Sequence, residues 1–292
     1  MKNIMAVIMI TLTVFLFFNT AYADMGPKDE LKVYVENSPD ELYYLDLLTQ
    51  DTREYDNFIR DEKRESFNQE MLDLLYSHED EGWKPAFVEG TGVPMWGNLI
   101  GEQKGDKMLH TFGYVGVPDT YRIIIVTESG EVSVSDVYTR KAMQSSITYD
   151  YTTGDVTEPI VWISYIIQFL TTCIPTLIIE GFILILFGFK LKENWKVFLT
   201  VNLITQVALT AILGTTLIKS GPITAYIIQF PVELGIILFE SILFARFLKG
   251  KSKSRRYVYG LVANLASWGV GFFLISYQYQ LLLMLLQANQ NY

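Results

Sequence analysis

The chain has 292 residues, half of them apolar, and a formal net charge of −9. This composition excludes an ordinary soluble domain, which is less apolar, and a chain embedded in membrane throughout, which is less charged. The charge divides the chain: residues 24–158 hold 28 acidic and 12 basic residues, whereas residues 159–292 hold 4 and 10. The acidic first half argues against a nucleic-acid partner, because it would repel phosphates.

The first 23 residues have the pattern of a secretory signal peptide. Lys2 supplies the positive start, residues 4–18 form an apolar core, and Ala21 and Ala23 are the small residues expected before a cleavage site. We expect cleavage after Ala23. An uncleaved anchor helix is the alternative, but the apolar core is shorter than the ~20 residues that a spanning helix needs.

Residues 24–158 predict a β-rich extracytoplasmic domain. Residues 31–36 alternate in the manner of a strand and are followed by a turn at 37–40. A hairpin is expected where two β-type segments flank the turn Glu128–Glu131. The expected strands cover 31–36, 42–48, 109–117, 121–126, 132–138 and 147–151.

One helix is expected inside this domain, over about 57–77. Phe67, Met71, Leu74 and Leu75 follow one another at the spacing of a helix face. The fold class predicted for this half is therefore a sandwich-like β domain with a helical insertion, long enough to bury its own core.

No catalytic constellation accompanies the only two histidines of the chain, His78 and His110. His110 lies in an expected strand, where a surface or packing role is the simplest interpretation. Residues 78–81, His-Glu-Asp-Glu, could bind a cation, but a solvated acidic turn after a helix is the commoner explanation. We therefore predict no catalytic residue, no metal site and no cofactor.

The second half, 159–292, predicts an all-α bundle of four transmembrane helices. The apolar stretches cover about 160–189, 197–218, 223–248 and 257–285, each long enough to cross the ~30 Å hydrocarbon core. The loops at 190–196 and 249–256 are rich in lysine and arginine and are expected in the cytoplasm. That orientation leaves residues 24–158 outside, as the signal peptide also requires.

Each of the four stretches carries a polar stripe. A carboxylate in hydrocarbon costs several kcal/mol unless it is paired, hydrogen-bonded, protonated or hydrated, so carboxylates there are functional candidates. Counting helix rise from the basic loops places these side chains at overlapping depths. The structural alternative is hydrogen bonding that only holds the helices together. The predicted intramembrane polar cluster consists of Glu180, Asn202, Gln206, Glu233, Glu240 and Asn264.

The single cysteine, Cys173, lies within the first of these apolar stretches. One cysteine permits no intrachain disulfide and supplies no metal-binding spacing. No cysteine lies near the expected cleavage site, so a lipid-anchored lipoprotein is not expected.

Short motifs lie at 25–28, 112–114, 121–125, 180–181, 202–206, Glu233, Glu240 and 263–267. Together they resemble a family of uncharacterised membrane proteins of Gram-positive bacteria. The resemblance covers nearly the whole length and implies a signal peptide, an extracytoplasmic β-rich domain and four C-terminal membrane helices at the cell surface. It implies no activity or substrate.

The sequence favours a non-enzymatic protein of the bacterial plasma membrane. In this hypothesis the outer domain binds or senses a component of the cell surface, or the chain is an accessory subunit of another membrane protein. The expected partners are membrane lipids and another membrane protein or a second copy. The alternative is a small ion or solute transporter that uses the intramembrane glutamates. An intramembrane enzyme is disfavoured because the apolar stretches contain no histidine.

Overall fold

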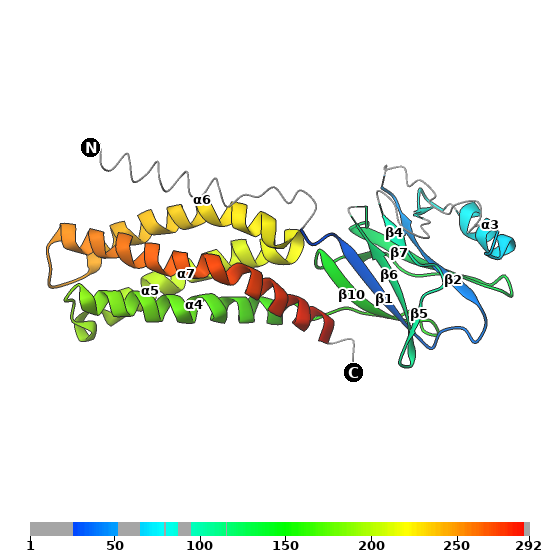
Figure 1. Ribbon diagram of the computed structural model, residues 1–292, viewed down its shortest axis with the longest axis horizontal. Coiled ribbons are helices and arrows are strands. Elements are labelled where there is room, and N and C mark those ends of the chain that lie inside the picture. Colours follow the sequence, from blue (N-terminus) through cyan, green and yellow to red (C-terminus); the bar gives the residue numbers. More distant parts are fainter. Residues whose placement is uncertain (1–25, 52–64, 79, 87–94, 115, 289–292) are drawn as a thin grey trace.

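The computed structural model describes residues 26–51, 65–78, 80–86, 95–114 and 116–288. A β domain and a bundle of long helices lie end to end (Figure 1). This confirms the predicted order of a β-rich region followed by helices. The predicted signal peptide, 1–23, lies outside the described residues.

The first sheet of the β domain is built around β1. Its order is β11-β10-β1-β6-β4, with β5 paired to β6. β1 and β10 are parallel, which requires a crossover connection between them, whereas the other pairs are antiparallel. Its strands are β1 (Glu30–Glu36), β4 (Trp96–Gly97), β5 (Glu102–Lys104), β6 (Lys107–Gly113), β10 (Gln144–Asp150) and β11 (Val156–Thr157).

The second sheet has the order β3-β2-β7-β8, with β9 paired to β7. All its pairs are antiparallel, and β7 and β8 form the hairpin predicted around 128–131. Its strands are β2 (Tyr43–Thr49), β3 (Lys84–Pro85), β7 (Thr120–Thr127), β8 (Val132–Val134) and β9 (Tyr138–Thr139).

The two sheets share one apolar core. Leu31, Val33 and Val35 of β1 are fully buried, and the polar residues between them are partly exposed, as the alternation predicted. They meet Leu45 and Leu47 of β2, so the domain is a two-layer sandwich.

The outer face of the second sheet is also buried, because α3 (Gln69–Ser77) covers it. Met71, Leu72 and Leu75 of α3 pack against Tyr44 and other side chains of this face. The helix is shorter than predicted. It begins after Asn68, whose side-chain oxygen accepts hydrogen bonds from the first free backbone amides. The part of the prediction over 57–64 lies outside the described residues.

Within the part of the chain that the structure describes, three helices are long and apolar enough to span a membrane: Val161–Leu186, Leu191–Phe247 and Lys253–Leu286. The first is α4 (Val161–Leu186), and the last lies within α7 (Lys253–Ala288). The middle run contains α5 (Leu191–Leu209), the π-helical turn η1 (Thr210–Gly214) and α6 (Thr215–Phe247). The stretches 197–218 and 223–248, predicted as separate helices, both lie in this run.

The middle run is not straight. Gly221 has φ 73° and ψ −178°, a conformation outside the helical region that residues with a Cβ rarely adopt. Thr205 and Glu240, 35 residues apart, are hydrogen-bonded, although a straight helix would separate them by about 52 Å. The chain therefore doubles back at Gly221, and the α5 and α6 segments lie side by side.

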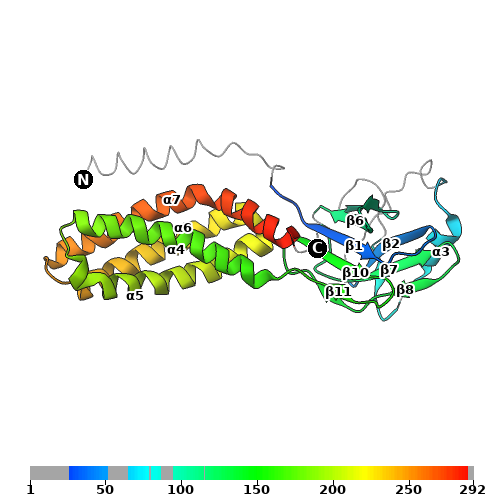
Figure 2. The ribbon, with the colours of Figure 1, turned by 90° about the horizontal axis from the view of Figure 1, so that it is seen from below.

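The β domain sits on the end of the bundle that contains this bend. The backbone amide of Met143 donates a 2.8 Å hydrogen bond to the carbonyl of Ile218. Ala142 and Met143 share an apolar cluster with Ile218 and Ile275 of the bundle. The basic loops around 190 and 250 lie at the opposite end (Figures 1 and 2). There the Asn194 side chain holds both backbone groups of Lys249.

Candidate functional site

All six residues of the predicted polar cluster lie in the interior of the bundle. None is more than 7% exposed, although most of the surrounding surface is apolar. They come from all four helical segments, because each polar stripe faces its neighbours: Glu180 on α4, Asn202 and Gln206 on α5, Glu233 and Glu240 on α6, and Asn264 on α7.

Glu240 is hydrogen-bonded from two sides. Its Oε1 accepts from the hydroxyl of Thr205, and its Oε2 accepts from Asn264 Nδ2 at 3.0 Å. The second hydrogen of that amide is donated to the carbonyl of Gly260 at 2.9 Å, which fixes the orientation of Asn264. One carboxyl group therefore connects α5, α6 and α7.

Glu180 contacts α7 through Ser267 and α5 through Asn202. Its Oε1 accepts a 2.8 Å hydrogen bond from Ser267 Oγ of α7, while Oε2 has no partner within the described residues. Asn202 interacts with Glu180, and its own Oδ1 is likewise buried without a partner in the part of the chain that is described. Two such acceptors need a hydrogen, from a proton on the carboxyl group or from a water molecule.

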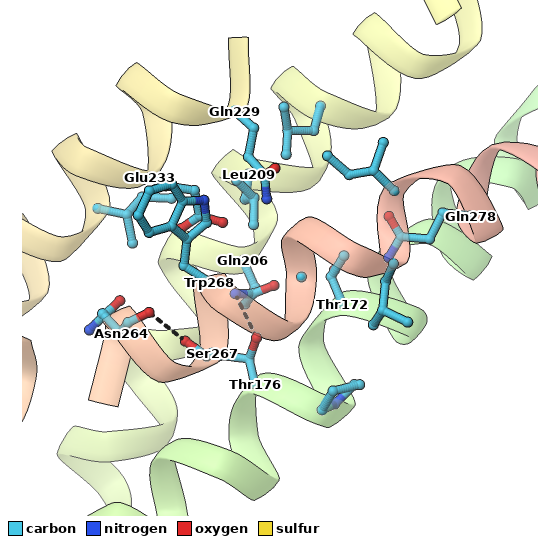
Figure 3. A pocket seen from close by; sticks show the side chains of 16 residues that line it. Thr172, Thr176, Gln206, Leu209, Gln229, Glu233, Asn264, Ser267, Trp268 and Gln278 are labelled. Carbon is cyan, nitrogen blue, oxygen red and sulfur yellow. Dashed lines mark hydrogen bonds between the residues drawn. The ribbon is translucent and has the colours of Figure 1, made fainter. Parts of the chain in front are cut away.

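Glu233 lies beside an internal cavity of about 30 Å³ (Figure 3). Gln206 and Gln229 face the same space, and Gln229 interacts with Glu233 one helical turn away. Trp268 and Gln278 of α7 line the cavity as well. Polar side chains from several helices therefore line one cavity in the interior of the bundle.

No basic side chain balances these carboxyl groups. Among the described residues, no lysine, arginine or histidine forms an ion pair with Glu180, Glu233 or Glu240. The three are close enough to repel one another when ionised. Buried charges need compensation, so the arrangement can bind protons or a cation and can be hydrated.

Several residues that complete the site were not in the predicted cluster. Gln229 and Ser267 belong to the polar stripes on which that prediction rested, so the sequence signal for them was present. Thr205 gave no comparable signal, because threonine is common in membrane helices and its partner is set by packing. Trp268 reads as an apolar residue until its indole nitrogen is placed.

In the β domain, His110 is a buried packing residue, and the alternative of a surface position is wrong. The Asn98 carbonyl can only accept, so Nδ1 carries the hydrogen of this 3.1 Å bond, and Nε2 accepts from the Tyr43 hydroxyl at 3.1 Å. Burial lowers the pKa of His110 to about 4, against a smaller opposing effect of the Asn98 bond. The imidazole is therefore neutral at ordinary pH and holds two strands and a loop together.

Comparison with protein-family models, with curated proteins and with solved structures found no match to this chain. The resemblance to a Gram-positive membrane protein family therefore stays a prediction. The interpretation of the site rests on its geometry.

Proposed function

We propose that this chain is a non-enzymatic integral protein of the bacterial plasma membrane with four membrane crossings. The bend at Gly221 supports the fourth crossing, since it divides the middle run into parts of about 30 and 26 residues, each above the ~20 that a span requires. The basic loops at 190–196 and 249–256 share one end of the bundle, which fits the cytoplasmic side. Residues 24–158 are then extracytoplasmic.

In this proposal the outer domain binds or senses a component at the cell surface and passes its state to the bundle, either alone or as an accessory subunit. The observation that carries the proposal is the junction at Met143. This residue contacts the bend of the middle run through its backbone and its side chain. A displacement of the outer domain therefore acts directly on the segment that leads to Gln229 and Glu233.

Arg140 makes this junction stiff. Its guanidinium is buried and donates to the Met143 carbonyl at 2.7 Å, to Asp119 at 2.8 Å and to Asp29 at 3.3 Å. Hydrogen bonds from a charged donor contribute more than neutral ones, about 1.5–3 kcal/mol each. These bonds from Arg140 therefore fix the backbone of the β domain at Met143, where it contacts the bundle.

The test is in-cell cross-linking of the tagged full-length chain, read by mass spectrometry, with a matched pair of variants. In Gly221→Ala the new Cβ would lie 2.7 Å from Met143 Cε at a backbone conformation that favours glycine. In Gly235→Ala, on the same helix, the Cβ meets nothing within 4 Å. We expect a recurrent stoichiometric partner with the wild type and Gly235→Ala, and a reduced yield with Gly221→Ala. Equal partner yields from Gly221→Ala and Gly235→Ala, or turnover of a substrate by the purified chain, would contradict the proposal.

Transport of an ion or small solute is the second candidate, favoured by the polar cavity beside Glu233. It predicts flux in liposomes that is lost in Glu233→Gln and in Glu180→Gln. Glu193→Gln, exposed in the first turn of α5, is the matched control. Absence of flux under every imposed gradient would count against transport while leaving the sensing proposal intact.

A further inference from the structure

The cavity beside Glu233 is lined by both donors and acceptors that lack partners. Gln206 Oε1 and Gln229 Oε1 are acceptors, and Trp268 Nε1 and Gln278 Nε2 are donors. All four atoms are buried and have no hydrogen-bond partner within the described residues. An unsatisfied buried group costs about 1–3 kcal/mol, so four around one space require a ligand that both donates and accepts.

Water has this chemistry, and a bare metal cation does not. A cation would satisfy the two amide oxygens but would be repelled by the indole and amide hydrogens of Trp268 and Gln278. A cavity needs at least about 10–15 Å³ to hold one water, which makes about three hydrogen bonds, so the cavity of about 30 Å³ has room for about two waters. The four atoms and the Glu233 carboxyl group provide enough partners for both.

The cavity lies between two apolar clusters along the bundle. On the side of the basic loops, Tyr259 contacts the rings of Phe187, Phe189 and Phe244 at centroid distances of 5.2–5.9 Å. On the side of the β domain the apolar cluster includes Leu217, Ile218, Ile275 and Leu282. A space of this size between such clusters suits water and a proton better than a solute.

A hydrogen-bonded path links the cavity to the other two carboxyl groups. Asn264 and Ser267 line the cavity. Asn264 donates to Glu240, and Ser267 donates to Glu180. These are the titratable groups that face Glu233, from α6 and α4, and the cavity-lining residues of α5 and α7 include none.

We propose that the cavity is a hydrated proton-binding site in which Glu233 takes up a proton through about two internal waters. A hydronium ion gives its proton to a Glu233 oxygen, which forms an O–H bond and leaves a neutral water. No oxidant or metal is involved. Proton uptake removes the charge that repels Glu240 and Glu180, so the occupancy of this site acts on the whole polar cluster.

The site is tested by infrared spectroscopy of the full chain in lipid bilayers during a pH titration in light and heavy water. We expect a carbonyl band of a protonated carboxylic acid that disappears on alkalinisation, shifts in heavy water and is absent in Glu233→Gln. Gln278→Met, close to Gln in size, removes one donor of the cavity lining that has no partner among the described residues, leaves the contact between Gln229 and Glu233 in place, and should shift this band. Glu193→Gln should leave it unchanged.

A titrating spectrum that is the same in Glu233→Gln and wild type would overturn the proposal. So would a Glu233 band that responds to sodium at constant pH, because the ligand would then be a metal cation. If Glu233→Gln fails to fold, the band shift in Gln278→Met and its heavy-water sensitivity decide the question in its place, and an unshifted band in Gln278→Met would overturn the proposal. The readout needs neither a partner nor flux, so it can succeed when the proposed sensing function fails, and the reverse.

Discussion

Acidification should loosen the β domain through His110. The imidazole is fully buried, and its pKa falls from an ordinary 6.5 to about 4 because burial disfavours the charged form. Between these values the unfolded chain binds more protons than the folded one, so stability is fully present above about pH 6.5 and decreases as the pH falls toward 4. On these values the loss between about pH 7.5 and pH 5 is roughly 2 kcal/mol from this residue.

Hydrogen exchange read by mass spectrometry on the full chain measures this loss, with β1 and β6 as reporters because His110 lies in β6. Carboxyl groups also titrate in this pH range and contribute to the stability change. Hydrogen bonds from neighbouring groups, for example, lower the pKa of Asp150 and Glu41. The comparison with His110→Gln removes these shared contributions. The wild type should lose roughly 2 kcal/mol more than the variant on acidification.

Parallel pH dependence in wild type and His110→Gln would refute the reasoning. A direct check needs no unfolding. The ring protons of His110 in nuclear magnetic resonance should titrate near pH 4, and the disappearance of one of the two histidine signals in the variant assigns them. A midpoint close to the ordinary value of 6.5 would show that the imidazole is not buried.

Three further changes have defined outcomes. Gly260→Ala places a Cβ 2.6 Å from the Ser241 backbone, so thermal stability in detergent should drop by about 1–3 kcal/mol, whereas Gly269→Ala, with open space, should be neutral or stabilising; equal effects would contradict this. Asn68→Ala removes the cap of α3, so the free energy that protects the first α3 amides from hydrogen exchange should fall by about 1 kcal/mol. Unchanged exchange would contradict the capping role. Arg140→Lys should lose about 2–3 kcal/mol of β-domain stability by urea unfolding, because one ammonium cannot replace a fork of donors, and a neutral result would contradict the role of Arg140 at the junction.

Local pattern predicted most of the elements. Alternation in residues 31–36 gave β1, turn residues at 128–131 gave the β7–β8 hairpin, and apolar length gave the helical bundle. Residues 65–68 of the helix predicted over 57–77 are not helical, because the periodicity of the apolar residues carries no information on the cap, Asn68, after which α3 begins. Pairing was beyond reach, since the parallel partnership of β1 and β10 joins strands more than a hundred residues apart.

The candidate site divides in the same way. A carboxyl or amide group in an apolar stretch is conspicuous in the sequence, because hydrocarbon penalises it wherever the helix lies. The hydrogen-bond partner of each group cannot be recognised in the sequence, because it depends on how each helix is rotated and shifted against its neighbours. Thr205 meets Glu240 only because the chain reverses at Gly221, and Ser267 meets Glu180 only because α7 packs beside α4.

The sequence by itself determined that an acidic β domain precedes apolar helices and that six polar residues lie in those helices, because composition and period are local properties. Only the tertiary structure decided that these residues converge, that a cavity of about 30 Å³ lies beside Glu233, and that Met143 sits on the bend of the middle run. Those features arise from contacts between distant segments, whose free energy depends on the packing of the whole chain.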